Sequence, residues 1–136
     1  MAEMNESFLK EDVLNADLLF GQLWEISADG MRLTDERGNV LLVNESFCKI
    51  FKMQKEQLIN RPFSIVYSLP EQESALKSYQ RDIRKNEIKT FFERESILWD
   101  GRKIWLEFSN SFLTLNDGQK ITLSVIKDIS KRKKAV

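Results

Sequence analysis

The residue types that most often carry out chemistry at neutral pH are nearly missing from this sequence. Histidine is absent, and Cys48 is the one cysteine. Without histidine there is no imidazole to act as a general acid or base, to ligate a metal or haem, or to accept a phosphoryl group. A single cysteine allows neither an internal disulfide nor a thiolate metal cluster. We therefore expect no catalytic residues and no metal site.

The carboxylates do not replace the missing imidazole. A small α+β enzyme, such as an isomerase-like or thioesterase-like fold, needs an acid or base placed inside its cavity. The Asp and Glu residues fall mostly in turns or on the polar faces of helices. An enzyme is therefore the less favoured alternative to a binding module.

One polar residue is a candidate for contact with a ligand. In the strand predicted over residues 103–115, Asn110 interrupts an otherwise apolar face formed by Ile104, Leu106, Phe108 and Phe112. A buried amide needs a partner, which is a ligand, a water or a neighbouring side chain. We predict that Asn110 lines a cavity. Four aromatic residues are candidates for the same wall, although their spacing also fits a simple core: Phe63, Tyr67, Tyr79 and Phe108.

The bulk composition narrows the class of protein. The chain has 136 residues, 42% hydrophobic and 31% charged, which is typical of one globular domain. Its 21 Lys and Arg residues balance 21 Asp and Glu residues, which argues against nucleic acid as a partner. No stretch approaches the ~20 apolar residues of a membrane span, and the acidic N-terminus is unlike a signal peptide. We expect a cytoplasmic protein without direct membrane insertion.

The N-terminal segment, residues 6–27, has helical spacing of its apolar residues. The seam of this amphipathic helix consists of Leu9, Val13, Ala16, Phe20 and Leu23. Such a helix packs on its own domain or pairs with a partner chain, and two heptads leave both alternatives open. We predict a homodimer, with this seam as the dimerisation surface.

The rest of the chain changes from short strands to helices and back to strands. A hairpin is predicted over 31–43, a helix over 45–52 capped by Asn44, a helical turn over 54–58 and a longer helix from Pro70 to about residue 87. Three alternating segments follow, over 90–99, 103–115 and 121–125, joined at Gly101 and Gly118. This order predicts an α+β fold, with a five-stranded antiparallel sheet whose helices cover one face and enclose a central space.

Five local strings in this order resemble the PAS superfamily, in its bacterial sensory-box form. They are residues 29–35 with 38–40, Val43-Asn44-Glu45-Ser46-Phe47, residues 57–63, the hairpin string Trp99-Asp100-Gly101 to Leu106, and the exit string, residues 125–133, which contains Asp128-Ile129-Ser130. Asn60 stands where the family more often has Gly, and Ser130 stands where it has Thr. The resemblance divides the chain into a capping or dimerisation helix (1–27), a PAS core (28–130) and the start of a signalling helix (131–136).

The resemblance implies a non-catalytic regulatory module of a bacterial histidine kinase, diguanylate cyclase or transcription regulator. Such modules bind a small molecule or cofactor between sheet and helices, dimerise, and pass a signal to an attached output domain through the exit helix. Some hold no ligand and serve as dimerisation spacers, and the sequence does not separate these alternatives.

The exit string is the predicted point of signal coupling. Asp128, Ile129 and Ser130 lead from the last strand into the final helix, and we expect Lys103 and the backbone around Trp105 to be their partners in the neighbouring hairpin. The alternative is an ordinary helix cap made by Asp128 or Ser130. The basic residues that follow, 131–134, fit the solvated first turn of a linker helix.

The cofactor is left open. Absence of histidine disfavours His-ligated haem. In flavin-binding light-sensing relatives the reactive cysteine lies near the position of residues 61–64, where this chain has none. Cys48 lies instead in the predicted helix beside Phe47 and Phe51, where a small core residue is expected, so cysteinyl-flavin chemistry is also disfavoured.

Overall fold

The first predicted hairpin is confirmed. In the computed structural model, which describes residues 18–135, β1 (Gly30–Thr34) pairs antiparallel with β2 (Val40–Val43). Gly38 in the turn has a φ of 89°, and a Cβ there would lie 2.6 Å from Leu76 Cδ1. The positive φ favours glycine at this position, and any larger residue would also have to displace the end of the Leu76 side chain.

The three C-terminal strands form the predicted meander. They are β3 (Phe91–Ile97), β4 (Lys103–Thr114) and β5 (Lys120–Asp128). The strand order is β2-β1-β5-β4-β3, and all pairs are antiparallel. The last strand thus inserts between the two hairpins, so that the five strands make one sheet, as predicted.

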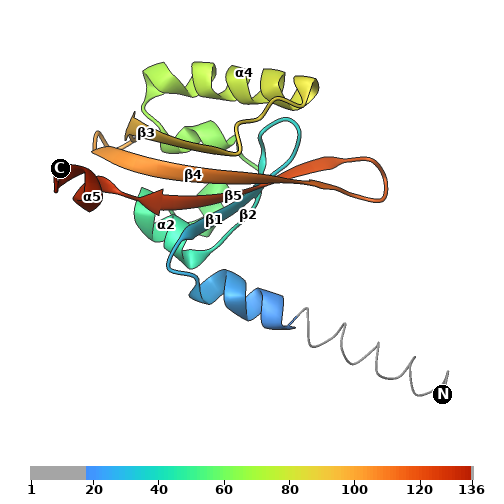
Figure 1. Ribbon diagram of the computed structural model, residues 1–136, viewed down its shortest axis with the longest axis horizontal. Coiled ribbons are helices and arrows are strands. Elements are labelled where there is room, and N and C mark those ends of the chain that lie inside the picture. Colours follow the sequence, from blue (N-terminus) through green and yellow to red (C-terminus); the bar gives the residue numbers. More distant parts are fainter. Residues whose placement is uncertain (1–17, 136) are drawn as a thin grey trace.

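Helices connect β2 to β3 and flank the sheet at both ends of the chain (Figure 1). The chain order is a helix over residues 18–26, α2 (Glu45–Phe51), α3 (Lys55–Leu58), the 3₁₀ turn η1 (Phe63–Val66), α4 (Leu69–Lys85) and α5 (Ser130–Lys134). The α+β class and the N-terminal helix are both confirmed. Among the described residues, no helix combines the length and apolar character required to cross a bilayer.

Asn44 caps α2, as predicted, and also connects three segments of the chain. Its Oδ1 accepts the N–H of Phe47 in α2 and of Met31 in β1, both at 2.9 Å. Its Nδ2 donates to the carbonyls of Trp24 and Asp29 at 2.8 and 3.0 Å. Because Asn44 is fully buried, all four bonds stabilise the junction of the N-terminal helix with the sheet.

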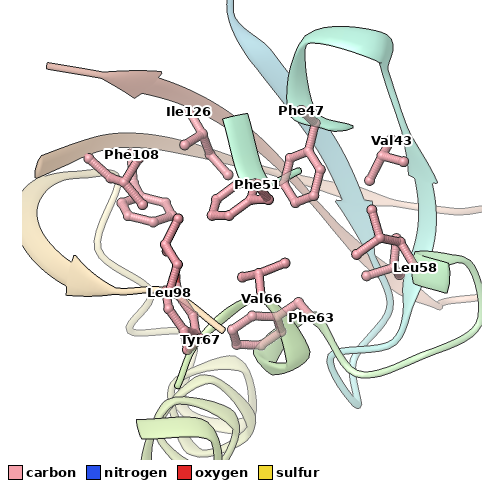
Figure 2. Packing of buried hydrophobic residues seen from close by; sticks show 12 residues of the cluster. Val43, Phe47, Phe51, Leu58, Phe63, Val66, Tyr67, Leu98, Phe108 and Ile126 are labelled. Carbon is pink, nitrogen blue, oxygen red and sulfur yellow. The ribbon is translucent and has the colours of Figure 1, made fainter. Parts of the chain in front are cut away.

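The core lies between one face of the sheet and the helices that cover it (Figure 2). Phe47 and Phe51 of α2 pack with ring centroids 4.5 Å apart, facing Leu106 and Ile126 of the sheet. The remaining buried members of the cluster are Val40, Val43, Leu58, Phe63, Val66, Tyr67, Leu98 and Phe108. Phe112 shares the inner face of β4 but lies beyond this core, with 41% of its surface exposed.

The predicted dimerisation seam is only partly visible. Leu9, Val13 and Ala16 lie outside the described residues. Phe20 and Leu23 are 56% and 53% exposed on the N-terminal helix, so they do not pack on the core of this chain. The residue that anchors the helix is Trp24, which is buried and stacks on Phe20 with ring centroids 5.9 Å apart.

Candidate functional site

A cavity of about 570 Å³ lies between the inner face of the sheet, η1 and α4. Its volume is within the range of small-molecule sites, roughly 300–1,000 Å³. All five residues predicted to line a cavity are on its wall: Phe63, Tyr67, Tyr79, Phe108 and Asn110. The structure thus brings together residues up to 47 positions apart, from Phe63 to Asn110; whether they bind a ligand stays a prediction.

The amide of Asn110 has protein partners on both sides. Its Oδ1 accepts the hydroxyl proton of Ser124 at 2.7 Å, and its Nδ2 donates to the carbonyl of Lys89 at 2.9 Å. Of the partners considered for this amide, the neighbouring side chain is therefore the one present. Asn110 holds Ser124 in place.

Arg32 is the cavity residue that sequence reasoning missed. It lies on β1 with only 4% of its surface exposed. Its Nη2 donates to Ser124 Oγ at 3.1 Å, and its guanidinium carbon lies 4.7 Å from the ring centroid of Phe63. Nε and Nη1 are buried without a hydrogen-bond partner among the described residues. Burial lowers the pKa of this guanidinium, and the nearby Tyr67 and Tyr79 act in the opposite direction.

The pairing of the strands explains how Arg32 reaches the cavity. Arg32 of β1 is the register partner of Ser124 of β5, which is the register partner of Asn110 of β4. The three polar side chains therefore form one row across the inner face of the sheet. The sequence does not reveal this row, because it does not show which face of β1 is buried. In β1 the face that carries Met31 and Leu33 is the more apolar one, so that face would be expected to point toward the core. A polar residue recurring in three predicted strands is the signal that could have revealed the row.

Tyr79 ties α4 to the sheet beside this row. Its hydroxyl donates to the carbonyl of Asp35 and lies 2.9 Å from both Thr34 Oγ1 and Thr122 Oγ1. Its ring meets Phe63 edge-on, with centroids 5.1 Å apart. Because its hydroxyl is already hydrogen-bonded, Tyr79 lines the cavity with its ring and anchors α4 to the sheet.

The remaining wall is apolar inside and charged at the rim. Phe92 and Phe108 stack with centroids 4.7 Å apart. Tyr67 is buried, and burial raises the pKa of its phenol, so the hydroxyl stays protonated at neutral pH. Charged residues lie at the rim: Arg81, Lys89 and Arg94, with Asp82 and Glu87, whereas the carboxylate of Glu93 is held on the outer face by α5. Arg32 is the charged residue of this wall that is buried.

The exit from β5 is tied to β4 through Trp105. The N–H of Ile129 donates to the Trp105 carbonyl at 2.9 Å, and the N–H of Trp105 donates to Ser130 Oγ at 3.1 Å. The Asp128 carboxylate accepts the N–H of Ser130 at 3.0 Å, which forms an Asx turn before α5. The expected cap is not formed, because the N-cap position of α5 is Ile129 and no side chain makes a capping bond there. Lys103, expected as a partner of Asp128, lies instead 3.4 Å from a carboxylate oxygen of Glu95 on β3.

The basic tail is also held by two carboxylates on the outer face of β3 and β4. Glu93 and Glu107 face Arg132 and Lys133 of α5, and we call these four residues the exit latch. Arg132 of α5 pairs with Glu93 and lies 3.5 Å from Glu107 Oε1. Lys133 Nζ lies 2.8 Å from Glu93 Oε1 and 4.6 Å from the centroid of the Trp105 ring. The hydrogen bond from Lys133 is the main reason why the pKa of Glu93 is lowered. No local sequence signal marks these pairs, because they join strands to a tail 25 to 40 residues away.

Cys48 lies partly buried in α2 as a free thiol. Burial, followed by the charge of Glu45, raises its pKa. A raised pKa disfavours the reactive thiolate. Within residues 18–135, no group of three or more Cys, Asp or Glu side chains is placed to hold a metal ion.

The model of a known family, the PAS fold, matches residues 19–129. The chain belongs to the PAS fold family. This PAS domain is also 28% identical over 130 residues to the C4-dicarboxylate transport sensor protein DctS of Rhodobacter capsulatus, covering 93% of this chain and 20% of DctS. The chain therefore spans about a fifth of the length of that relative.

Solved structures agree with this fold. The PAS domain of an HTR-like protein from Haloarcula marismortui has a TM-score of 0.68 and 18% identity, over 90% of this chain and 99% of that one. The PAS domain of the Cronobacter turicensis quorum-sensing receptor RpfR, in complex with BDSF, has a TM-score of 0.59 and 17% identity, over 76% of this chain and 95% of that one.

Proposed function

We propose that this PAS domain is a non-catalytic sensory module that binds a small molecule in the cavity between the sheet and α4. The observation that carries the proposal is the cavity itself, whose wall combines apolar rings with the buried and partly unpaired Arg32. A structural neighbour is described in complex with BDSF, which supports ligand binding by this fold. The module belongs to a larger bacterial signalling protein: a histidine kinase, a diguanylate cyclase or a transcription regulator.

The proposed signal leaves through β3 and the exit latch. Phe92 and Arg94 of β3 line the cavity, and the carboxylate of Glu93, between them, holds α5 on the outer face. A ligand that displaces β3 therefore moves the partner of Arg132 and Lys133. The Trp105 backbone bonds to Ile129 and Ser130 supply a second connection to α5, and Asp128 shapes the turn.

The proposed assembly is a homodimer with a covalently attached output domain. Exposed apolar side chains on the N-terminal helix support it: Leu18, Leu19, Phe20, Leu23 and Ile26. Burial of these side chains against a second copy removes apolar surface from water. A location in the cytoplasm, without nucleic acid as a partner, is part of the same proposal.

A ligand-free dimerisation spacer is the second candidate. The polar groups of Asn110 and Tyr79 favour it, because the amide oxygen of Asn110, one of its two Nδ2 N–H bonds and the hydroxyl of Tyr79 are already bonded within the chain. The unpartnered nitrogens of Arg32 favour the sensory module.

Native mass spectrometry of freshly purified protein, together with its ultraviolet–visible spectrum, tests the two candidates. A sensory module is expected to carry a bound mass, or to gain one from a metabolite library. The control variant Ala75→Phe narrows the cavity from α4 and should remove that mass while leaving the oligomeric state unchanged. A dimer that takes no compound from the library would favour the spacer, and a monomer without ligand would contradict both.

A further inference from the structure

Arg32 is a buried cation without a counter-ion. Among the described residues, it forms no ion pair, and the carboxylates that line the cavity lie at its rim. Of its five N–H bonds, the one on Nε and the two on Nη1 have no acceptor within residues 18–135. Guanidinium stays charged in proteins, so a positive charge lies at the inner wall of the cavity.

Such an arrangement is costly for the folded domain. A buried charge is ordinarily paired, because removing an ion from water is penalised heavily. The face of the Phe63 ring and the hydroxyl of Ser124 offset part of this penalty, as a cation–π contact and one hydrogen bond. Neither carries a full negative charge, so neither neutralises the guanidinium.

The row across the sheet keeps this guanidinium in place. Ser124 accepts from Nη2 and is itself held by Asn110, which is anchored to the Lys89 carbonyl. A side chain fixed in this way is preorganised for a ligand, since little further ordering is needed on binding.

We propose that the ligand of this cavity is a small monocarboxylate with an apolar body, and that Arg32 binds its carboxylate. The proposal rests on the proposed function, that the cavity takes a small molecule. One buried cation is balanced by one anion, whereas a dianion would leave a negative charge desolvated against aromatic walls. Arginine presents two N–H bonds in a fork that matches a carboxylate. The rings of Phe63, Phe92 and Phe108 suit an alkyl or aryl body.

Isothermal titration with matched acids and amides tests the inference. The probes are butanoate, octanoate and dodecanoate, the corresponding primary amides, and succinate. The wild-type chain is expected to bind at least one monocarboxylate about 10- to 100-fold more tightly than its amide, as charge-assisted hydrogen bonds require. Butanoate is expected to bind more tightly than succinate.

Two variants locate the effect. Arg32→Met keeps an unbranched side chain and removes the charge, so the acid-to-amide preference should fall to about one, without a lower melting temperature of the unliganded protein. The control Arg84→Met removes an exposed cation of α4 that does not line the cavity, and it should keep the wild-type preference. In the wild-type chain, the nitrogen-15 resonance of Arg32 Nε should shift with the preferred acid and not with its amide, which gives a readout independent of the variants.

The outcomes separate the inference from the function on which it rests. Equal affinity for acid and amide, abolished by Ala75→Phe, would show a ligand site without anion recognition and would overturn the inference alone. Tighter binding of succinate, or an acid preference retained in Arg32→Met, would overturn it as well. If no probe binds and the purified chain carries no bound mass, the proposed sensory function fails with it.

Discussion

At the scale of single residues, the cavity is organised by polar side chains that bond to one another. Arg32, Ser124 and Asn110 occupy one register row of three strands. Ser124 is fully buried and uses its hydroxyl both as an acceptor and as a donor. The row therefore depends on this one hydroxyl group.

Ser124→Ala should reveal that dependence. The variant leaves Arg32 Nη2 and Asn110 Oδ1 without their partner, and unsatisfied buried groups cost about 1–3 kcal/mol each. We expect the free energy of unfolding, measured by urea denaturation, to fall by about 2 kcal/mol. Ser111→Ala, on the exposed part of β4, is the control and should change it by less than about 0.5 kcal/mol. Equal effects would mean that the row carries no stability.

Asn44→Ala is the second residue-scale prediction. It removes the cap of α2 together with the bonds to Trp24 and Asp29, so the loss should exceed the ~1 kcal/mol of a typical cap. Ser68→Ala is a matched control, because Ser68 occupies the N-cap position of α4 without a side-chain capping bond. Thermal unfolding should show a clear drop in melting temperature for the first variant and almost none for the second. A similar drop in both would contradict the role given to Asn44.

At the scale of elements, strands, hairpins and caps could be predicted from the sequence because their causes are local. Alternation, Gly-containing turns and Asn44 each act within a few residues. Which face of β1 points inward could not be predicted from the sequence, since pairing with β5 decides whether Arg32 or Met31 faces the core. The exit latch could not either, because its partners meet only after β3 and α5 are placed side by side.

The latch predicts how α5 responds to a change in β3. Glu93→Gln weakens the pairs to Arg132 and Lys133, and exposed ion pairs contribute little individually, so the effect should be modest. We expect amide hydrogen exchange in residues 130–134 to accelerate by a factor of about two to five. Glu95→Gln is the matched control, because Glu95 lies on the same strand and pairs with Lys103 instead. Faster exchange in the control would assign the effect to β3 as a whole.

The same latch should respond to acid. The pKa of Glu93 is lowered in the folded chain, mainly by the hydrogen bond from Lys133. The stabilisation of α5 by the Glu93 carboxylate is therefore complete above the pKa that this residue has in the unfolded chain. It is lost as the pH falls through the lower pKa of Glu93 in the folded chain. Exchange in α5, corrected for its intrinsic pH dependence, should be steady from neutral pH down to about 5 and rise below about 4. The Glu93→Gln variant should lack this rise, and a rise of equal size in that variant would exclude Glu93 as the titrating group.

At the scale of the whole molecule, the N-terminal helix exposes a group of apolar side chains that a dimer could bury. Phe20 and Leu23 are exposed on the N-terminal helix, whereas Trp24 of the same helix is buried and Asn44 bonds to its carbonyl. The helix is thus fixed to the domain on one side and presents apolar side chains on the other. This division explains why the sequence alone left packing on the domain and pairing with a partner open: the structure supports the first through Trp24 and leaves a surface for the second.

A charge introduced on that surface should separate the two copies. Leu23→Glu places a carboxylate where the proposed interface buries leucine, and desolvating an unpaired charge is costly. We expect the dissociation constant of the dimer, measured by light scattering across a concentration series, to rise at least about tenfold, with little change in the melting temperature of the monomer. The control Leu69→Glu alters a leucine at the start of α4 that is more exposed, at 80% against 53% for Leu23, and should leave the dimer intact. A wild-type chain that is monomeric at high micromolar concentration would contradict this role of the N-terminal helix. Equal dissociation of both variants would contradict it as well. The apolar residues exposed on β3 and β4 would then be the next candidates for a dimerisation surface.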